Sequence, residues 1–230
     1  MIVTIHQPQY LPWLGYFDKA QRADIFIILD DVQFKKNDWQ NRNRIRTSQG
    51  WQWLTLPVLH NHGQSILEVK INSTTNWRKA HFNALKMNYS KTPFFKTYIE
   101  FFESVYEREW ELLVDINMCF IEQIIKWLGI TTRIVKSSDY NIEGEKTERL
   151  INLCKECKAT TYLSGADGQN YMDLDQFEQN NIQLEIQDYH HPVYPQYWTD
   201  GEKTNFISHM SVVDLLFNCG PDSFKILQGN

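Results

Sequence analysis

Positive charge is scarce in this sequence of 230 residues, which has 23 Lys and Arg against 28 Asp and Glu and a net charge of -5. Because non-specific binding to nucleic acid requires an excess of cations on one face, this balance argues against nucleic acid as a main partner. No apolar run reaches the roughly 18 residues of a membrane span. The opening MIVTIH also lacks the basic start and long apolar stretch of a secretory signal. We therefore expect a cytoplasmic protein with no membrane partner.

Glycine and proline are also few, at 10 and 7 residues, whereas hydrophobic residues make up 42% and aromatic residues 14% of the chain. This composition excludes a disordered chain and supports a sizeable core. At this length one elaborated core is expected rather than two. We predict a single domain over residues 1–230, with an N-terminal α/β part (1–72), a helical segment (73–130) and a C-terminal α/β part (131–230).

Only four cysteines are present, too few and too scattered for a disulfide framework. Cys154 and Cys157 form a CxxC pair, but their spacing puts both thiols on the apolar face of a predicted helix, and no second pair completes a zinc site. We interpret these cysteines, with Cys119 and Cys219, as structural core residues. No metal site is predicted from them.

The order of apolar runs predicts an α/β fold. Residues 3–7 are predicted to form a strand, 13–23 a helix, and 24–34 a second strand with five consecutive large apolar residues. Such a run is typical of a strand buried on both faces of a parallel sheet. Strands and helices alternate again after residue 131. We predict a mostly parallel sheet of N- and C-terminal βαβ units, with a helical middle segment.

Two further patterns concern the parts between these units. Residues 51–60 and 66–72 flank the turn-like NHGQS and predict an antiparallel hairpin. Three stretches of the middle segment place apolar residues three and four apart, which predicts packed helices, the last of them ending at Gly129. Near the C-terminus, Ser211 and Asp214 have the spacing of a helix capping box.

Polar residues follow each of the first two predicted strands. Gln7 to Pro12 would form the loop after the first strand, and Asp30, Asp31 and Gln33 would follow the second. Open α/β sheets bind ligands at the carboxyl ends of their strands, so both segments are expected to face one crevice. Two carboxylates at the end of a buried strand favour a functional role, with capping of the next segment as the alternative.

Five stretches spread over the chain resemble the WbqC-like family. They are HQPQYLPWLGYFDKAQRADIFIILDDVQFKKNDWQNRNRIRT, WLTLPV, YLSGADGQNYMD, HPVYPQ and MSVVDLLFNCG, and the resemblance runs from residue 1 to about residue 220. It implies a place in O-antigen or other surface polysaccharide biosynthesis, as a transferase that adds glycine or another small acyl group to a sugar amine. The substrates implied are a small acyl donor and an amino sugar or nucleotide sugar.

The first 44 residues contain the groups that such a transfer would use. If ATP and magnesium activate the acyl group as an adenylate, His6, Arg42 and Arg44 are candidate donors to the phosphates. Asp30 or Asp31 is the candidate carboxylate to orient the amine or a magnesium ion. We take His6, Asp30 and Asp31 as candidate catalytic residues. The alternatives are a loop histidine bonded to backbone and a solvated positive face for the arginines.

Polar and aromatic side chains near the predicted strand ends are candidates for binding the substrate. Ser164 lacks the flanking pattern of a nucleophile elbow, so it is assigned to a binding loop. Adjacent His190 and His191 would point to opposite sides of a strand, so at most one enters the site. The substrate-binding candidates are Gln7, Tyr10, Trp13, Gln33, Arg42, Asn43, Arg44, Ser164, Gly165, Gln169, Tyr171, His191, Tyr194 and Gln196.

Two other functions remain open at this stage. One is a non-catalytic protein that binds a nucleotide sugar or glycan precursor, and the other is a nucleotidyl-transferring enzyme using ATP. Convergence of His6, Asp30, Asp31 and Arg42 on one pocket would favour an enzyme, whereas a pocket lined only by Trp, Tyr, Gln and Ser would favour the binding protein. The acyl donor could be glycine with ATP, a thioester, or an aminoacyl-tRNA as the one nucleic-acid partner expected.

Overall fold

Five short strands form an all-parallel sheet in the computed structural model, which describes residues 1–199 and 205–229. The strands are β1 (Ile2–His6), β2 (Ile25–Ile28), β7 (Arg133–Lys136), β8 (Thr161–Ser164) and β9 (Gln183–Ile186). Their order is β7-β2-β1-β8-β9, so strands from both ends of the chain share one sheet. This arrangement confirms the predicted α/β fold.

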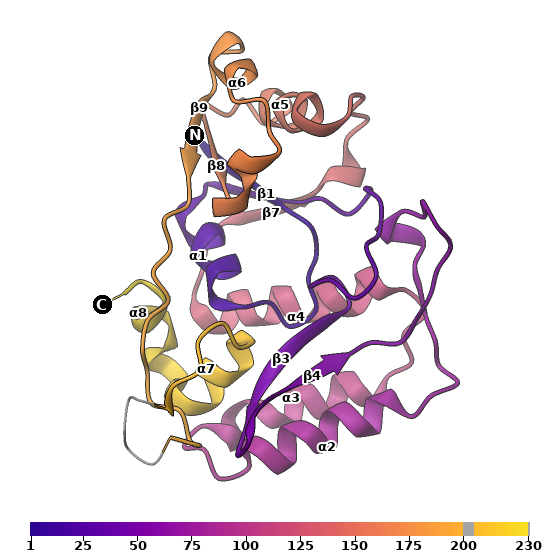
Figure 1. Cartoon of the computed structure of the whole chain (residues 1–230), viewed down its shortest axis with the longest axis vertical. Coiled ribbons are helices and arrows are strands. Elements are labelled where there is room, and N and C mark those ends of the chain that lie inside the picture. Colours follow the sequence, from indigo (N-terminus) through magenta and orange to yellow (C-terminus); the bar gives the residue numbers. More distant parts are fainter. Residues whose placement is uncertain (200–204, 230) are drawn as a thin grey trace.

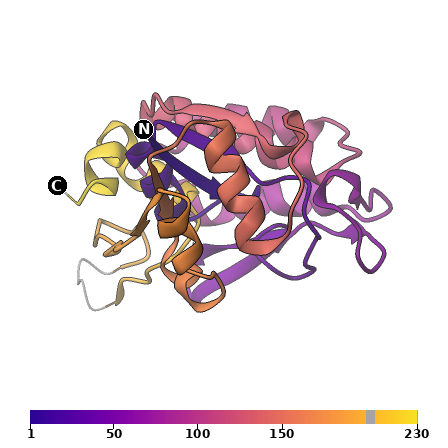
Figure 2. The ribbon, with the colours of Figure 1, turned by 90° about the horizontal axis from the view of Figure 1, so that it is seen from above.

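Helices cover both faces of the sheet, with α5 and α6 above it and α1 and α4 below it in Figure 1. These helices are α1 (Leu14–Arg22), α4 (Leu113–Leu128), α5 (Lys146–Glu156) and α6 (Asp175–Gln179). Successive residues of β2 point to opposite faces. Phe26 and Ile28 join the apolar cluster that contains α1 and α4, whereas Ile25 and Ile27 join the cluster of α5 and α6. Figure 2, a view from above, shows α5 and α6 lying in front of the strands. Apolar layers on both sides explain why every residue of β2 is buried.

The order in which the chain adds strands to the sheet reverses between β1 and β8. From β1 the chain adds β2 and then β7 on one side, whereas β8 and β9 are added on the other side. In open α/β sheets, ligands bind outside the carboxyl ends of the strands at such a point. The residues that follow His6 and Ser164 therefore flank the position where a ligand site is expected.

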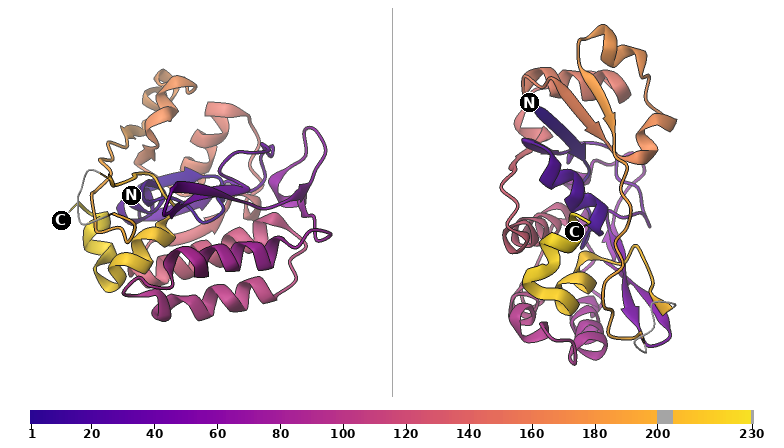
Figure 3. Two further views of the ribbon diagram at one scale, coloured as in Figure 1. Left: turned by 60° about the horizontal axis from the view of Figure 1, so that its bottom comes forward. Right: turned by 90° about the vertical axis from the view of Figure 1, so that its left-hand side faces the viewer.

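The middle segment is helical, as predicted, and lies at the end of the molecule opposite to α5 and α6 (Figure 3). It contains α2 (Trp77–Tyr89) and α3 (Phe95–Glu107), which pack together, and α4, which ends at the left-handed Gly129 (φ 68°). Of the C-terminal helices, α7 (Val212–Cys219) packs against α3, whereas α8 (Ser223–Leu227) packs against α7 and α1. Within residues 1–199 and 205–229, no helix is both long and apolar enough to cross a membrane.

Short 3₁₀ segments connect several of these elements. They are η1 (Ile66–Glu68), η2 (Ser137–Asp139), η3 (Ala166–Asn170) and η5 (Gly220–Asp222).

The hairpin predicted from residues 51–60 and 66–72 is only partly right. Of these residues, β5 (Val58–Leu59) and β6 (Lys70–Ile71) do pair in antiparallel fashion. In contrast, β4 (Gly50–Thr55) pairs with β3 (Arg42–Thr47), which the sequence did not reveal as a strand. In β3, arginines alternate with buried Asn43 and Ile45, so few apolar residues mark the strand. Its turn residues, Ser48 and Gln49, also lack the Asn-Gly or Asp-Gly signal of a tight hairpin.

The predicted capping box at α7 is wrong for Asp214. Ser211 does accept a hydrogen bond from a backbone N–H of the first turn, but Asp214 is fully buried and faces the other way. Its carboxylate accepts hydrogen bonds from Tyr89 (2.9 Å), Tyr194 (2.8 Å) and Gln196 (2.8 Å). Burial raises the pKa of Asp214, opposed by these bonds. The carboxylate thus joins α7 to α2 and to the segment after β9.

The two CxxC cysteines lie in positions that fit a structural role, one buried and one half-buried. Cys154 packs in the cluster of α5 and α6 with Leu150 and Ile151, and burial raises the pKa of its thiol to about 12. Cys157 is half-buried beside Tyr140, and its pKa is also raised by burial. Because a thiolate is the reactive and metal-binding form, these shifts disfavour both roles.

Candidate active site

A cavity of about 750 Å³ opens at the carboxyl ends of β1 and β8, at the switch point of the sheet. This volume is typical of sites for small molecules. Its wall combines residues from many parts of the chain: the end of β1, the loop between β1 and α1, α1, the loop after β2, β3, β8 with the loop after it, the segment after β9, and the turn before α7. The polar and aromatic residues that line it include His6, Gln7, Gln9, Trp13, Tyr16, Lys19, Lys35, Asp38, Trp39, Gln40, Arg44, Asp167, Tyr171, Gln187, Tyr189 and His209.

The centre of the cavity holds a contact between His6 and Lys19. His6 is the last residue of β1, and Lys19 projects from α1, so the crossover that follows β1 brings them together. The Lys19 ammonium nitrogen lies 2.6 Å from His6 Nδ1, and Gln9 Nε2 lies 3.0 Å from His6 Nε2. Gln9 Oε1 is buried without a hydrogen-bond partner. A 180° rotation of this amide would let Oε1 accept from Nε2–H, while Lys19 donates to Nδ1.

Burial decides the protonation of this pair. It lowers the pKa of Lys19 from 10.5 to about 7, although the nearby Asp18 carboxylate acts in the opposite direction. Burial, with the charge of Lys19 as a smaller cause, also holds the pKa of His6 well below its ordinary 6.5. At neutral pH the imidazole is therefore neutral, and Lys19 is divided between its charged and neutral forms. A neutral buried amine is able to act as a base or nucleophile.

The 3₁₀ turn after β8 forms one wall of the cavity. Gly165 lies beside the Lys19 ammonium, and a Cβ atom at that position would be 3.6 Å from Nζ. Gly168 packs directly on Ser164, where a Cβ would lie 2.0 Å from the hydroxyl oxygen. Only glycine fits this close approach. The turn thus holds Asp167 and the largely exposed Tyr171 at the mouth.

Aromatic rings form the opposite rim. Trp13 stacks on His209 (centroids 5.2 Å apart) and meets Tyr189 edge to face at 5.6 Å. Behind this rim, Gln187 donates to the Asp18 carboxylate (2.7 Å) and fixes α1 to the segment after β9. Flat rings beside polar groups suit a sugar or a nucleotide base.

Six of the sequence candidates meet in this cavity. They are His6, Gln7, Trp13, Arg44, Gly165 and Tyr171.

Asp30 and Asp31 lie elsewhere, at the ends of β2 and β7. Asp30 is fully buried and accepts hydrogen bonds from the Ser138 hydroxyl and the Ser138 N–H, and the Ser137 hydroxyl oxygen lies 3.1 Å from its carboxylate. Asp31 accepts from Ser137 and forms an ion pair with Arg149 at 2.5 Å. The ends of β1 and β2 are adjacent, since the Leu29 N–H donates to the His6 carbonyl oxygen (2.8 Å). Neither carboxylate lines the cavity, however, because both are bonded to groups of η2 and α5.

The other candidates do not line the cavity either. Tyr10, Asn43, Ser164, Tyr194 and Gln196 are buried and hydrogen-bonded within the protein, for example Tyr10 to His81 and Tyr106. Gln33 and Gln169 are exposed outside it, Arg42 lies at the start of β3, two residues before Arg44, and His191 packs against His209. Loop position alone could not separate residues that face inward from those that face the cavity.

The sequence candidates missed Lys19, Gln9, Asp38, Trp39, Gln187, Tyr189 and His209. For Lys19 the signal is its burial, which only the structure shows. In the helix, Lys19 stands among Tyr16, Phe17 and Ala20, on a stretch where nearly every residue is buried. A lysine within such a stretch is an unusual core residue and a candidate for function.

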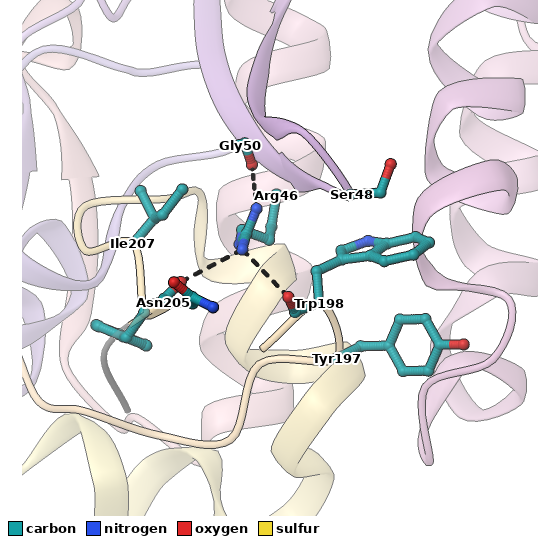
Figure 4. A pocket seen from close by; sticks show the side chains of 8 residues that line it. Arg46, Ser48, Gly50, Tyr197, Trp198, Asn205 and Ile207 are labelled. Atoms are coloured by element: carbon teal, nitrogen blue, oxygen red, sulfur yellow. Dashed lines mark hydrogen bonds between the residues drawn. The ribbon is translucent and has the colours of Figure 1, made fainter. Parts of the chain in front are cut away.

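A second cavity, of about 770 Å³, lies beside the β3–β4 turn (Figure 4). The guanidinium of Arg46 dominates it and donates to the carbonyl oxygens of Gly50 (2.6 Å), Asn205 (3.3 Å) and Trp198 (3.4 Å). Because Arg46 is only 4% exposed and committed to these carbonyls, we assign it a structural role. Within residues 1–199 and 205–229, no group of three or more His, Cys, Asp or Glu is placed to hold a metal ion.

Comparisons with known proteins agree with the resemblance seen in the sequence. The profile of the WbqC-like protein family matches residues 7–226. The uncharacterized protein Rv1507c of Mycobacterium tuberculosis (strain ATCC 25618 / H37Rv) is 41% identical over 225 residues, covering 96% of this chain and 95% of that protein. No solved structure matches.

Proposed function

Because the chain belongs to the WbqC-like protein family, we propose that it transfers glycine or another small acyl group to the amino group of a sugar for surface polysaccharide such as O-antigen. The observation that carries the chemistry is the buried contact of Lys19 with His6, 2.6 Å apart, in a cavity of about 750 Å³. The choice of acceptor follows from the family resemblance.

Amide formation requires a group that takes up a proton. The amine nitrogen forms a bond to the acyl carbon, the bond from that carbon to its leaving group breaks, and the nitrogen loses a proton. Neutral Lys19, whose pKa is lowered to about 7, accepts this proton and returns it to the leaving group. His6 stays neutral beside it and holds the Lys19 nitrogen in place.

Other wall residues supply binding groups. Arg44 provides a positive charge for a carboxylate or phosphate of a bound substrate. If the donor is free glycine activated by ATP, magnesium would accompany the phosphates, usually with one or two protein carboxylates. Asp38 and Asp167 are the carboxylates on the cavity wall. A thioester or aminoacyl-tRNA donor would need neither ATP nor magnesium.

Mass spectrometry of the product tests this proposal. The protein is incubated with free and nucleotide-linked amino sugars, each with glycine plus ATP and magnesium, coenzyme A thioesters, or glycyl-tRNA. We expect an amide with one pairing, and kcat/KM that rises with pH through about 7 as Lys19 loses its proton.

Substitutions of two lysines, one inside and one outside the cavity, test whether Lys19 takes part in the transfer. Lys19→Met should lower kcat about a hundredfold or more, whereas Lys36→Met, at an exposed lysine outside the cavity, should leave it unchanged. No amide from any pairing, or full activity in Lys19→Met, would reject the proposal.

A non-catalytic binding protein for a nucleotide sugar or glycan precursor is the second candidate. Its support is the set of aromatic rings on the cavity wall, Trp13, Trp39, Tyr171 and Tyr189. A ligand that binds wild type and Lys19→Met equally well, without turnover, would favour this function.

A further inference from the structure

The outer face of the β3–β4 hairpin presents cations and indole rings. Side chains of a strand alternate between faces, so Arg42 and Arg44 of β3 share a face with Trp51 and Trp53 of β4, and Arg44 stands opposite Trp53. On the inner face, residues such as Ile45 are buried in the core. The hairpin is therefore anchored on one side and offers the other side to solvent.

These side chains form one cluster, which we call the Trp–Arg platform: Trp39, Arg42, Arg44, Trp51 and Trp53. The Arg42 guanidinium carbon lies 4.2 Å from the centroid of the Trp53 ring, and that of Arg44 lies 5.2 Å from Trp51 and 5.8 Å from Trp39. Trp51 and Trp53 remain 43% and 37% exposed. Grouped, exposed indoles of this kind mark a binding surface more than they contribute to a core.

Within residues 1–199 and 205–229, the two guanidinium groups have no anionic partner, since none of the ion pairs there involves Arg42 or Arg44. Among the described residues, the Arg44 guanidinium donates to the carbonyl oxygen of His209 (3.2 Å), and its buried Nε has no partner there. A neutral glycan would leave both charges uncompensated, whereas a phosphate or diphosphate would neutralise them through paired hydrogen bonds.

The platform continues into the cavity, because Arg44 and Trp39 belong to both. Nearer the turn of the hairpin, Arg46 donates to the carbonyl oxygens of Trp198 and Asn205 (Figure 4) and is therefore not part of the platform. A ligand held by the platform would extend towards Lys19. The acidic net charge of -5 disfavours a long polyanion and fits a single nucleotide.

We propose that the Trp–Arg platform binds the nucleoside diphosphate part of the acceptor, with the base stacked on Trp53 or Trp51 and the diphosphate held by Arg42 and Arg44. The sugar would then enter the cavity. This inference names the acceptor class and rests on the proposed function only for the sugar end. Binding of the nucleotide itself is measured without any transfer reaction.

Isothermal titration with UDP and ADP as probes tests the platform. We expect at least one to bind wild type, with uridine and adenosine weaker because they lack the diphosphate. Trp53→Ala should weaken binding by about 5- to 100-fold, in line with the loss of base stacking, and Trp53→Phe should retain most of it. Arg44→Gln should weaken it by about 10-fold or more. Arg108→Gln, at an exposed arginine outside the platform, should bind as wild type does.

Lys19→Met separates this inference from the proposed function. It should bind the nucleotide normally while losing transfer. If neither nucleotide binds wild type, or if Trp53→Ala and Arg44→Gln bind as tightly as wild type, the platform proposal is wrong. Amide formation on a nucleotide-free amino sugar would still support the transferase. Conversely, nucleotide binding at the platform without any amide product would leave this inference standing and reject the transferase.

Discussion

Replacing Lys19 by Met should make the stability of the protein less dependent on pH between 7 and about 9.5. Lys19 is only 2% exposed, and burial lowers its pKa from 10.5 to about 7. Over this range the unfolded chain keeps the lysine proton and the native state releases it, so the free energy of unfolding rises with pH. Since each pKa unit corresponds to about 1.4 kcal/mol, the contribution of Lys19 grows by about 3 kcal/mol across the range.

Urea denaturation at several pH values measures this effect as a difference between wild type and Lys19→Met. Groups common to both proteins, such as the buried tyrosines with raised pKa values, cancel in that difference. The variant also leaves His6 Nδ1 without its partner, but above pH 7 this cost of about 1 to 3 kcal/mol is constant. Lys36→Met is the control and should follow the wild-type pH dependence. A difference between wild type and Lys19→Met that does not change with pH would refute the reasoning.

Three further substitutions test other parts of the structure. Asp214→Ala should lower the free energy of unfolding by about 3 to 5 kcal/mol because three buried donors lose their acceptor. Asp188→Ala, at an exposed carboxylate, should cost less than about 0.5 kcal/mol, and equal losses in urea titrations would contradict the role given to Asp214. Asp30→Asn should lower the melting temperature through its contacts with Ser137 and Ser138 but leave ligand binding intact. Lost binding at an unchanged melting temperature would place Asp30 in the site after all. Gly168→Ala should cost about 1 to 3 kcal/mol because its Cβ would overlap Ser164, whereas Gly165→Ala should be tolerated, and similar melting temperatures would show that the turn relaxes.

The strands of the sheet and the helices that cover it were predictable because a run of apolar residues directly indicates a buried segment. The stretch IFII is buried on both faces, and its composition shows this. Strand order was not predictable to the same degree, since pairing of β1 with β8 joins residues about 160 positions apart. The sequence therefore placed a candidate site at the carboxyl edge of β1 and β2, and residues that follow both strands do line the cavity, but it did not indicate that β8 borders the cavity on the other side.

The individual site residues were harder to predict for a related reason. Residue type and loop position suggested Tyr10 and Tyr194 as readily as Trp13, but the first two point into the core and donate or accept hydrogen bonds there. Lys19 lies in a helix whose other residues were interpreted as packing against the core, so it was not selected as a site residue. The direction in which a side chain points depends on the neighbouring elements. It could therefore not be predicted before the packing of those elements was known.

The central position of β1 has a consequence for how the chain is made. A ribosome releases β1 and β2 early, yet the second edge of β1 has no partner until β8 (Thr161–Ser164) has been synthesised. At about 5 to 20 residues per second, this interval is on the order of ten seconds. An apolar strand with an open edge is a template for pairing with other chains. The yield of native protein should therefore depend on translation speed, temperature and chaperone supply.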